Sequence, residues 1–168
     1  MLEMLRPRVQ ADSVLGLDGE ELKKAGIRGI IFDLDNTLVE WKQEKLNPAV
    51  VELVHRLKEK GFKMCILSNA LESRVGIVAG TLGIPYVSRA VKPRKFPFKK
   101  ALQILGTTPG ETAVVGDQLF TDILGGNRMN LYTIWTIPLS STEFAYTRMV
   151  RQLERLVVKR FRRKGVLQ

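Results

Sequence analysis

The sequence predicts an α/β fold in which a parallel sheet lies between two layers of helices. Short apolar segments rich in β-branched residues alternate along the chain with segments of helical periodicity. The apolar segments are continuous rather than alternately apolar and polar, which is typical of strands buried on both faces of a parallel sheet. Such a sheet binds ligands beyond the carboxyl ends of its strands, so polar residues at these ends are the first candidates for a site.

The expected elements follow one another from residue 19. Asp18 can cap a short helix over 19–25, which Gly26 ends. Asn47-Pro48 indicates the start of a second helix, because asparagine is a favourable cap and proline is tolerated in the first turn. Further helices are expected over 71–82, 97–105 and 120–128. The five expected strands are 27–32, 62–67, 84–87, 112–115 and 131–136.

Beyond Pro138 the sequence predicts one basic amphipathic helix over 143–164. Its apolar residues recur at spacings of three and four, which predicts one apolar face; they are Tyr146, Val150, Leu153, Val157 and Phe161. Between Arg148 and Lys164 there are eight basic residues and one acid, Glu154. The ordinary interpretation is a solvated helix packed on the core. The alternatives are a helix lying on an anionic membrane surface and a helix that binds nucleic acid or a ribosomal assembly.

Composition limits the class of protein. The 168 residues have the length of one ordinary domain, and we expect a single domain over 1–168 with its core over 27–137. No apolar run approaches the roughly 18 residues of a membrane span. The one cysteine, Cys65, lies in an apolar run and is interpreted as a core residue, which fits a reducing compartment. We therefore expect a cytoplasmic protein, which the basic helix could attach peripherally to the inner face of the membrane.

Polar residues stand at the predicted carboxyl ends of several strands. Asp33 and Asp35 follow the first strand, and an Asp-rich turn is the ordinary interpretation of one such pair. Here that interpretation weakens, because further polar residues recur after later elements. They are Ser68-Asn69, Lys92-Pro93, and Gly116-Asp117 followed by Asp122.

These residue types suit phosphoryl transfer from an ester, which needs a nucleophile, charge neutralisation and a proton for the leaving oxygen. Asp33 could attack phosphorus and form an aspartyl-phosphate, while Asp35 protonates the leaving alkoxide and later activates water. Asp33 and Asp117 offer the oxygen ligands that Mg²⁺ prefers. Ser68 and Lys92 could hold the phosphoryl oxygens. The net charge of +10 fits an anionic substrate.

The same residues resemble the four motifs of the haloacid dehalogenase (HAD) superfamily. The first is Asp-Leu-Asp-Asn-Thr-Leu from Asp33, the second is Ser68-Asn69, the third Lys92-Pro93, and the fourth Gly-Asp-Gln-Leu-Phe-Thr-Asp from Gly116. The resemblance implies a Rossmann-like three-layer α/β/α fold with strand order 5-4-1-2-3. It implies Mg²⁺ bound by Asp33, Asp117 and the backbone carbonyl of Asp35, with Thr37 and Asp122 supporting the site. Lys95 remains an alternative to Lys92 as the phosphate-binding lysine.

Longer stretches resemble the bacterial YqeG family, which is similar to mitochondrial phosphatidylglycerophosphate phosphatases. The matching stretches are Asp-Leu-Asp-Asn-Thr-Leu-Val-Glu-Trp and Thr-Asp-Ile-Leu-Gly-Gly-Asn-Arg. The gaps between motifs leave no room for a cap domain, so we expect an open site and a phosphomonoester on a large body. The resemblance makes phosphatidylglycerophosphate the leading substrate. A phosphatase for soluble phosphosugars or nucleotides and a basic docking protein for RNA or ribosomes are the alternatives.

Overall fold

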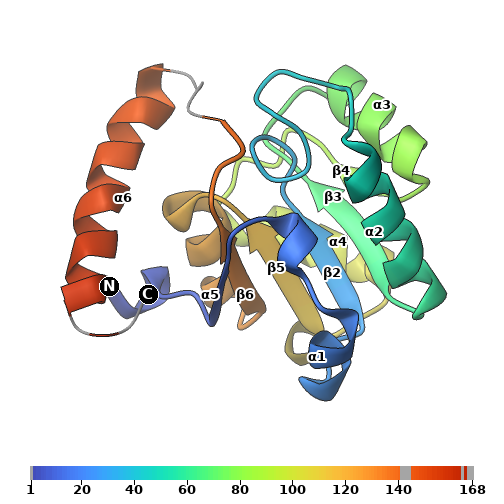
Figure 1. The fold of residues 1–168 in the computed structure, drawn as a ribbon, viewed down its shortest axis with the longest axis horizontal. Helices are drawn as coiled ribbons and strands as arrows, with labels where there is room; N and C mark the ends of the chain where they lie inside the picture. The colour runs from blue at the N-terminus through green and yellow to red at the C-terminus, as the bar shows by residue number, and fades with distance from the viewer. Residues whose placement is uncertain (1, 141–144, 164, 166–168) are drawn as a thin grey trace.

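A six-stranded parallel sheet organises the protein in the computed structural model, which describes residues 2–140, 145–163 and 165 (Figure 1). The strand order is β1-β6-β5-β2-β3-β4. The strands are β1 (Val9–Ala11), β2 (Gly29–Phe32), β3 (Lys63–Leu67), β4 (Tyr86–Val87), β5 (Thr112–Gly116) and β6 (Tyr132–Thr136). The α-helices are α1 (Gly19–Lys24), α2 (Pro48–Glu59), α3 (Glu72–Leu82), α4 (Lys95–Leu105), α5 (Leu124–Arg128) and α6 (Ala145–Arg163). Short 3₁₀ turns occupy Leu2–Leu5, Val14–Gly16 and Pro109–Glu111.

The predicted order of the five expected strands is confirmed, and one strand was missed. The five are β6, β5, β2, β3 and β4 in spatial order. The missed strand β1 lies at the edge beside β6, where Val9 pairs with Ile134 in parallel register. It has three residues, and Val9 is 37% exposed. An edge strand of this kind carries no continuous apolar run, so the hydrophobic pattern could not indicate it.

The core lies on both faces of the sheet because successive strand residues point to opposite sides. On one face, Ile30 and Phe32 pack in a cluster with apolar residues of α2 and α3. On the other, Ile31 and Cys65 pack in a cluster with Phe98 of α4. Each fully buried side chain of this size stabilises the fold by about 1.5–3 kcal/mol. Cys65 is buried as predicted, and burial raises the pKa of its thiol to about 12, so it is chemically inert.

Local capping explains where the helices on the sheet begin. The Asp18 side chain accepts a hydrogen bond from the Glu20 amide at 2.8 Å, and Asn47 caps α2 in the same way, as predicted. Helix α4 begins at Lys95 rather than at residue 97. The largest local difference is the segment Leu119–Ile123, called η4, which is a π-helical turn rather than the start of an α-helix. Such turns are frequent at functional sites.

The face that α6 packs on the body differs from the predicted one. Phe161 is buried against a third cluster that includes Leu5 and Trp135, as the periodicity predicts. Leu153 was expected on the same face but is 52% exposed, whereas Glu154 is 3% exposed. The reason is polar: the Glu154 carboxylate accepts hydrogen bonds from backbone amides of η4. Of the other predicted positions, 143, 144, 164 and the side chain of Tyr146 lie outside the described residues.

The residues between the motifs form single loops and helices. Within residues 2–140 no domain is inserted over the carboxyl edge of the sheet, which confirms the expected absence of a cap. Among the helices that the structure describes, none combines the length and the hydropathy needed to cross a lipid bilayer.

Candidate active site

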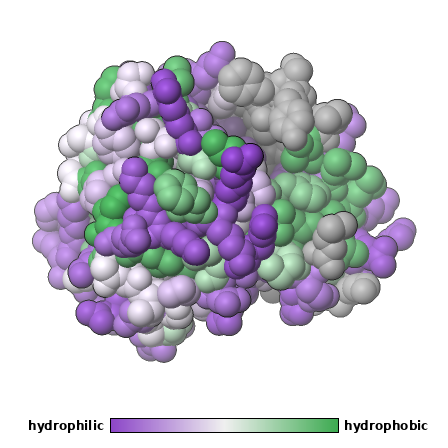
Figure 2. Space-filling model, turned by 180° about the vertical axis from the view of Figure 1, so that it is seen from behind, coloured by the Kyte–Doolittle hydropathy of each residue, from purple (hydrophilic) through white to green (hydrophobic). Residues whose placement is uncertain are grey.

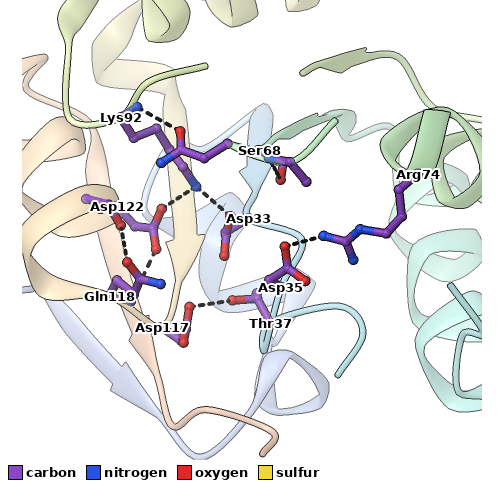
Figure 3. Close-up of polar contacts among 12 residues, drawn as sticks. Asp33, Asp35, Thr37, Ser68, Arg74, Lys92, Asp117, Gln118 and Asp122 are labelled. Atoms are coloured by element: carbon purple, nitrogen blue, oxygen red, sulfur yellow. Dashed lines mark hydrogen bonds and ion pairs between the residues drawn. The ribbon is translucent and has the colours of Figure 1, made fainter. Parts of the chain in front are cut away.

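The predicted acidic residues meet at the carboxyl edge of the central strands (Figure 3). Asp33 continues β2, and its amide donates to the Val115 carbonyl of β5 at 2.9 Å. Asp117 follows β5 directly and is fully buried. Ser68 follows β3 and is also buried. The parallel register of β2 with β3 and with β5 therefore brings these three residues together from distant parts of the chain.

The ammonium group of Lys92 lies between two carboxylates (Figure 3). Its Nζ is 2.5 Å from Asp33 Oδ1 and 2.6 Å from Asp122 Oδ1. The Lys92 side chain is 3% exposed, and the loop that carries it is held by its own amide, which donates to Asn69 Oδ1 at 2.8 Å. Lys95 is exposed at the first position of α4. The buried position beside Asp33 favours Lys92 over Lys95 as the lysine that meets a phosphoryl group.

The backbone around the fourth motif is shaped to bring Asp122 close. A Cβ on Gly116 would lie 2.4 Å from Asp122 Cγ, so only glycine fits at the end of β5. Asp122 Oδ2 accepts a hydrogen bond from the Gln118 amide at 3.2 Å. The Thr37 hydroxyl donates to Asp117 Oδ1 at 3.5 Å, and the Trp135 indole donates to the Asp117 carbonyl at 2.9 Å.

Negative charge exceeds positive charge in this buried cluster. Burial raises the pKa of Asp33 to about 7; the Lys92 ammonium opposes this shift and the Asp122 carboxylate adds to it. Burial opposes the charge of Lys92, but Asp122 and Asp33 together outweigh it and raise the pKa of Lys92. The pKa of Asp33 thus rises mainly through burial, whereas the pKa of Lys92 rises because two carboxylates surround its ammonium group.

The site offers the oxygen ligands of a divalent cation. Carboxylate oxygens of Asp33, Asp117 and Asp122 lie within 4.8 Å of one another, and all three residues are buried. A hard cation such as Mg²⁺ binds such oxygens and would offset the excess negative charge. The sequence analysis assigned the metal to Asp33, Asp35 and Asp117, with Asp122 as a supporting residue. In the structure, the Asp122 carboxylate is itself close enough to bind the same cation.

Asp35 lies apart from the buried cluster and is partly exposed. Its Oδ2 forms an ion pair with Arg74 of α3, and its Oδ1 accepts a hydrogen bond from the Lys42 amide at 3.2 Å. Arg74 was missed by the sequence analysis. A basic residue six positions after Ser68, in the first turn of the following helix, was the available signal.

Glu154 is the second residue that the sequence analysis missed. Its Oε1 accepts a hydrogen bond from the Leu119 amide at 2.6 Å and one from the Phe120 amide at 3.3 Å. Both amides belong to the first turn of η4, and the same turn carries Asp122. Helix α6 therefore supplies the carboxylate that satisfies the free amides at the beginning of η4.

The residues predicted to bind phosphate lie on the loops that follow β3 and β4. Ser68 Oγ accepts a hydrogen bond from the Ala70 amide at 3.1 Å, so its hydroxyl proton can be donated elsewhere. Asn69 is exposed and contacts the Lys92 amide. The assignments of Ser68, Asn69 and Lys92 to phosphate binding stay predictions.

The sequence profile of the haloacid dehalogenase-like hydrolases matches residues 39–130, more than half of the chain. The probable phosphatase YqeG of Bacillus subtilis is 40% identical over 156 residues, which cover 93% of this chain and 91% of that protein. The chain belongs to the haloacid dehalogenase-like hydrolases. Its relatives in this family are phosphatases, so the chain is a HAD phosphatase.

Further relatives in the HAD family are larger than this chain. A chloroplastic and mitochondrial phosphatidylglycerophosphate phosphatase of Arabidopsis thaliana is 31% identical over 174 residues, covering 98% of this chain. The chain spans 50% of that protein. A mitochondrial phosphatidylglycerophosphatase of Saccharomyces cerevisiae is 29% identical over 65% of this chain and 66% of its own length.

Solved structures agree with the HAD fold. An uncharacterized protein from Listeria monocytogenes aligns with a TM-score of 0.57 at 20% identity, over 79% of this chain and 99% of its own. The cobalt-bound deoxy-D-mannose-octulosonate 8-phosphate phosphatase of Haemophilus influenzae aligns with a TM-score of 0.55 at 14% identity, over 82% of this chain and 90% of its own. At these identities the likeness concerns the fold alone.

Proposed function

We propose that this HAD phosphatase is a magnesium-dependent phosphomonoesterase that forms an aspartyl-phosphate on Asp33, with phosphatidylglycerophosphate as its leading substrate. The observation that carries the proposal is the arrangement of Asp33 beside the buried Lys92, with Asp35 two residues further along the same loop. These groups supply a nucleophile, a fixed positive charge and an acid at one edge of the sheet.

The proposed reaction has two steps. A carboxylate oxygen of Asp33 attacks phosphorus, the bond from phosphorus to the ester oxygen breaks, and Asp35 gives its proton to the leaving oxygen. Asp35, now a carboxylate, takes a proton from a water molecule that attacks the aspartyl-phosphate, which frees inorganic phosphate and restores Asp33. Lys92 stays charged and holds the phosphoryl oxygens throughout.

The donor set suits Mg²⁺, which Asp33, Asp117 and the Asp35 carbonyl would hold with support from Asp122. When bound, the cation neutralises charge on the phosphoryl oxygens. Thr37 orients Asp117 through its hydroxyl group. The Trp135 indole fixes the carbonyl of the same residue.

Exposed apolar side chains beside the site support a lipid substrate. Leu71, Val91 and Phe96 are 60%, 55% and 75% exposed. Leu71 and Val91 come from the two loops that carry the proposed phosphate-binding residues, and Phe96 lies in the first turn of α4. The Arg89 amide donates to the Ala70 carbonyl at 3.0 Å, which joins the two loops. Exposed apolar side chains among cations suit insertion into the headgroup region of an anionic bilayer. The exposed cations here are Arg89, Arg94, Lys95 and Lys99.

Helix α6 offers a second surface of the same kind. Figure 2 shows an apolar area flanked by hydrophilic side chains on the side where α6 lies. Leu153 and Leu156 are 52% and 65% exposed on this helix. The exposed cations around them are Arg155, Lys159, Arg160, Arg162 and Arg163. We propose that this face contacts an anionic membrane, with RNA as the competing partner.

A phosphate-release assay tests the reaction and the substrate together. The protein is given phosphatidylglycerophosphate in mixed micelles, p-nitrophenyl phosphate, phosphosugars and nucleotides, each with Mg²⁺ and with EDTA. We expect Mg²⁺-dependent release, greatest from the lipid, and none from Asp33→Asn. Release from phosphosugars or nucleotides but not from the lipid would favour the soluble-substrate alternative. Absence of release from every compound would contradict the enzymatic proposal.

A matched pair of variants tests the lipid surface. Phe96 and Ile104 are exposed at opposite ends of α4, and only Phe96 lies at the carboxyl edge of the sheet. We expect Phe96→Ser to lower binding to vesicles of phosphatidylcholine with phosphatidylglycerol while leaving hydrolysis of p-nitrophenyl phosphate unchanged. Ile104→Ser is the control and should bind as the wild type does. Equal binding by the two variants would refute the apolar contact through Phe96. Equal binding of the wild type to neutral and to anionic vesicles would refute the electrostatic part of the contact.

A further inference from the structure

Hydrogen bonds join the loop that carries Lys92 to the loop that follows β3. One of them links backbone to backbone, from the Arg89 amide to the Ala70 carbonyl at 3.0 Å, and almost any residue could supply it. The bond at Lys92 is of another kind, because the Lys92 amide donates to Oδ1 of the Asn69 side chain at 2.8 Å. This bond therefore depends on which residue occupies position 69.

The backbone of the Lys92 loop needs support from its surroundings. Val91, directly before the lysine, has a φ angle of 55°, and Arg89 has a φ angle of 47°. Residues with side chains disfavour this left-handed region, and a β-branched residue such as valine disfavours it strongly. A strained conformation of this kind persists only where the surrounding contacts hold it. The hydrogen bond to Asn69 acts at the end of the strained segment, on the residue that carries the ammonium group.

The position of the Lys92 backbone decides where its ammonium group lies. Figure 3 shows the side chain running from its loop to a point between Asp33 and Asp122. There Nζ is 2.6 Å from Asp122 Oδ1. A lysine side chain is a flexible stem, so a loop that is free to move would place the ammonium group elsewhere. A misplacement of about 1 Å in an active site can lower the rate about a hundredfold.

We propose that Asn69 is a positioning residue, whose carboxamide oxygen fixes the backbone of Lys92 and thereby holds the ammonium group between Asp33 and Asp122. The inference rests on the proposed phosphatase function and gives Asn69 a role other than the direct phosphate contact that the sequence predicts. The two roles use opposite ends of the carboxamide. Positioning needs the acceptor oxygen, whereas contact with an anionic phosphoryl group needs the NH₂ donor.

Two substitutions of Asn69 separate these roles. Asn69→Asp keeps an acceptor oxygen but has no donor and adds a negative charge, whereas Asn69→Ala has neither group. For hydrolysis of p-nitrophenyl phosphate with Mg²⁺, we expect Asn69→Ala to lower kcat/KM about ten- to a hundredfold. Asn69→Asp should retain clearly more activity than Asn69→Ala. Direct phosphate binding gives the reverse order, because the added carboxylate repels the substrate, and that order would refute positioning.

Asn47→Ala is the matched control. Asn47 Oδ1 also accepts a hydrogen bond from a backbone amide, that of Ala49 at 2.9 Å, but it does so at the beginning of α2. Its removal should lower the urea midpoint at least as much as Asn69→Ala does and leave kcat/KM unchanged. An equal loss of kcat/KM in Asn47→Ala would show that any lost bond of this type lowers activity, which would overturn the inference.

Crystal structures of the wild type and of both Asn69 variants separate this inference from the proposed reaction, because they need no turnover. We expect Lys92 Nζ to stay beside Asp33 and Asp122 in Asn69→Asp and to leave them in Asn69→Ala. An ammonium group that stays in place in Asn69→Ala overturns the inference, whatever the activities are. If the group is displaced as expected but the wild type releases no phosphate from any substrate, the proposed reaction fails and the positioning role stands.

Discussion

Replacement of Glu154 by alanine tests how the basic helix is joined to the active site. The change removes the acceptor of two backbone hydrogen bonds at the start of η4, one of which is fully buried. A buried amide left without its charged acceptor costs about 1–3 kcal/mol, and the second, longer bond costs less. We therefore expect Glu154→Ala to lower the free energy of unfolding by about 3 kcal/mol.

Urea unfolding followed by tryptophan fluorescence measures this loss. With a slope of about 2 kcal/mol per molar urea, the midpoint should fall by about 1.5 M. Glu154→Gln keeps an acceptor and should lose about half as much. Leu153→Ala changes the exposed neighbour on the same helix and should stay within about 0.5 kcal/mol of the wild type. Equal midpoints for Glu154→Ala and Leu153→Ala would refute the assignment of Glu154 as the polar anchor of α6.

Three further predictions concern the acidic cluster. In EDTA, the folded protein keeps a proton on Asp33 up to about pH 7 that the unfolded chain releases near 3.8. As pH rises from 4 to 7, the wild type should therefore lose up to about 4 kcal/mol of unfolding free energy relative to Asp33→Asn. The urea midpoints of the two proteins, measured against pH, check this; parallel curves for the two would contradict it. Gly116→Ala should displace Asp122, lower the free energy of unfolding by about 1–3 kcal/mol and abolish phosphate release. Gly110→Ala is the control and should retain activity, because a Cβ at that position meets open space. Millimolar Mg²⁺ should raise the melting temperature of the wild type by several degrees, about 2–4 °C for each kcal/mol of binding, but not that of Asp117→Asn; equal shifts in both would place the metal elsewhere.

The catalytic edge could be predicted because its signals are local. Three of the apolar strands are followed by Asp33, Ser68 and Asp117, and a parallel sheet collects the carboxyl ends of its strands on one edge, so the sequence predicts that these residues lie together. The strand order came from the resemblance to a family, since periodicity alone does not give the neighbours of a strand. The sequence alone could not choose between Lys92 and Lys95 as the lysine beside Asp33, because both follow the same strand within a few residues.

The contacts that sequence reasoning missed depend on how helices dock. Arg74 and Asp35 are 39 residues apart, and Glu154 and Leu119 are 35 apart. The hydrophobic pattern of α6 favours a face that includes Leu153, but a buried carboxylate that satisfies free amides outweighs the burial of one leucine side chain. The spacing of apolar residues in α6 carries no information about unsatisfied backbone amides on η4. The sequence therefore could not predict that α6 turns Glu154 rather than Leu153 toward the body of the protein.

The third hydrophobic cluster has a consequence for the order in which the protein is made. It joins Leu5 to Phe161 of α6, and it includes Trp135, whose indole donates a hydrogen bond to the Asp117 carbonyl. All of the proposed catalytic residues are synthesised before α6, yet Glu154 and Phe161 come after them. On the ribosome, a nascent chain therefore holds all of the proposed catalytic residues before α6 can anchor η4, the segment that carries Asp122. This anchor forms only after α6 has been synthesised and has folded back beside Leu5.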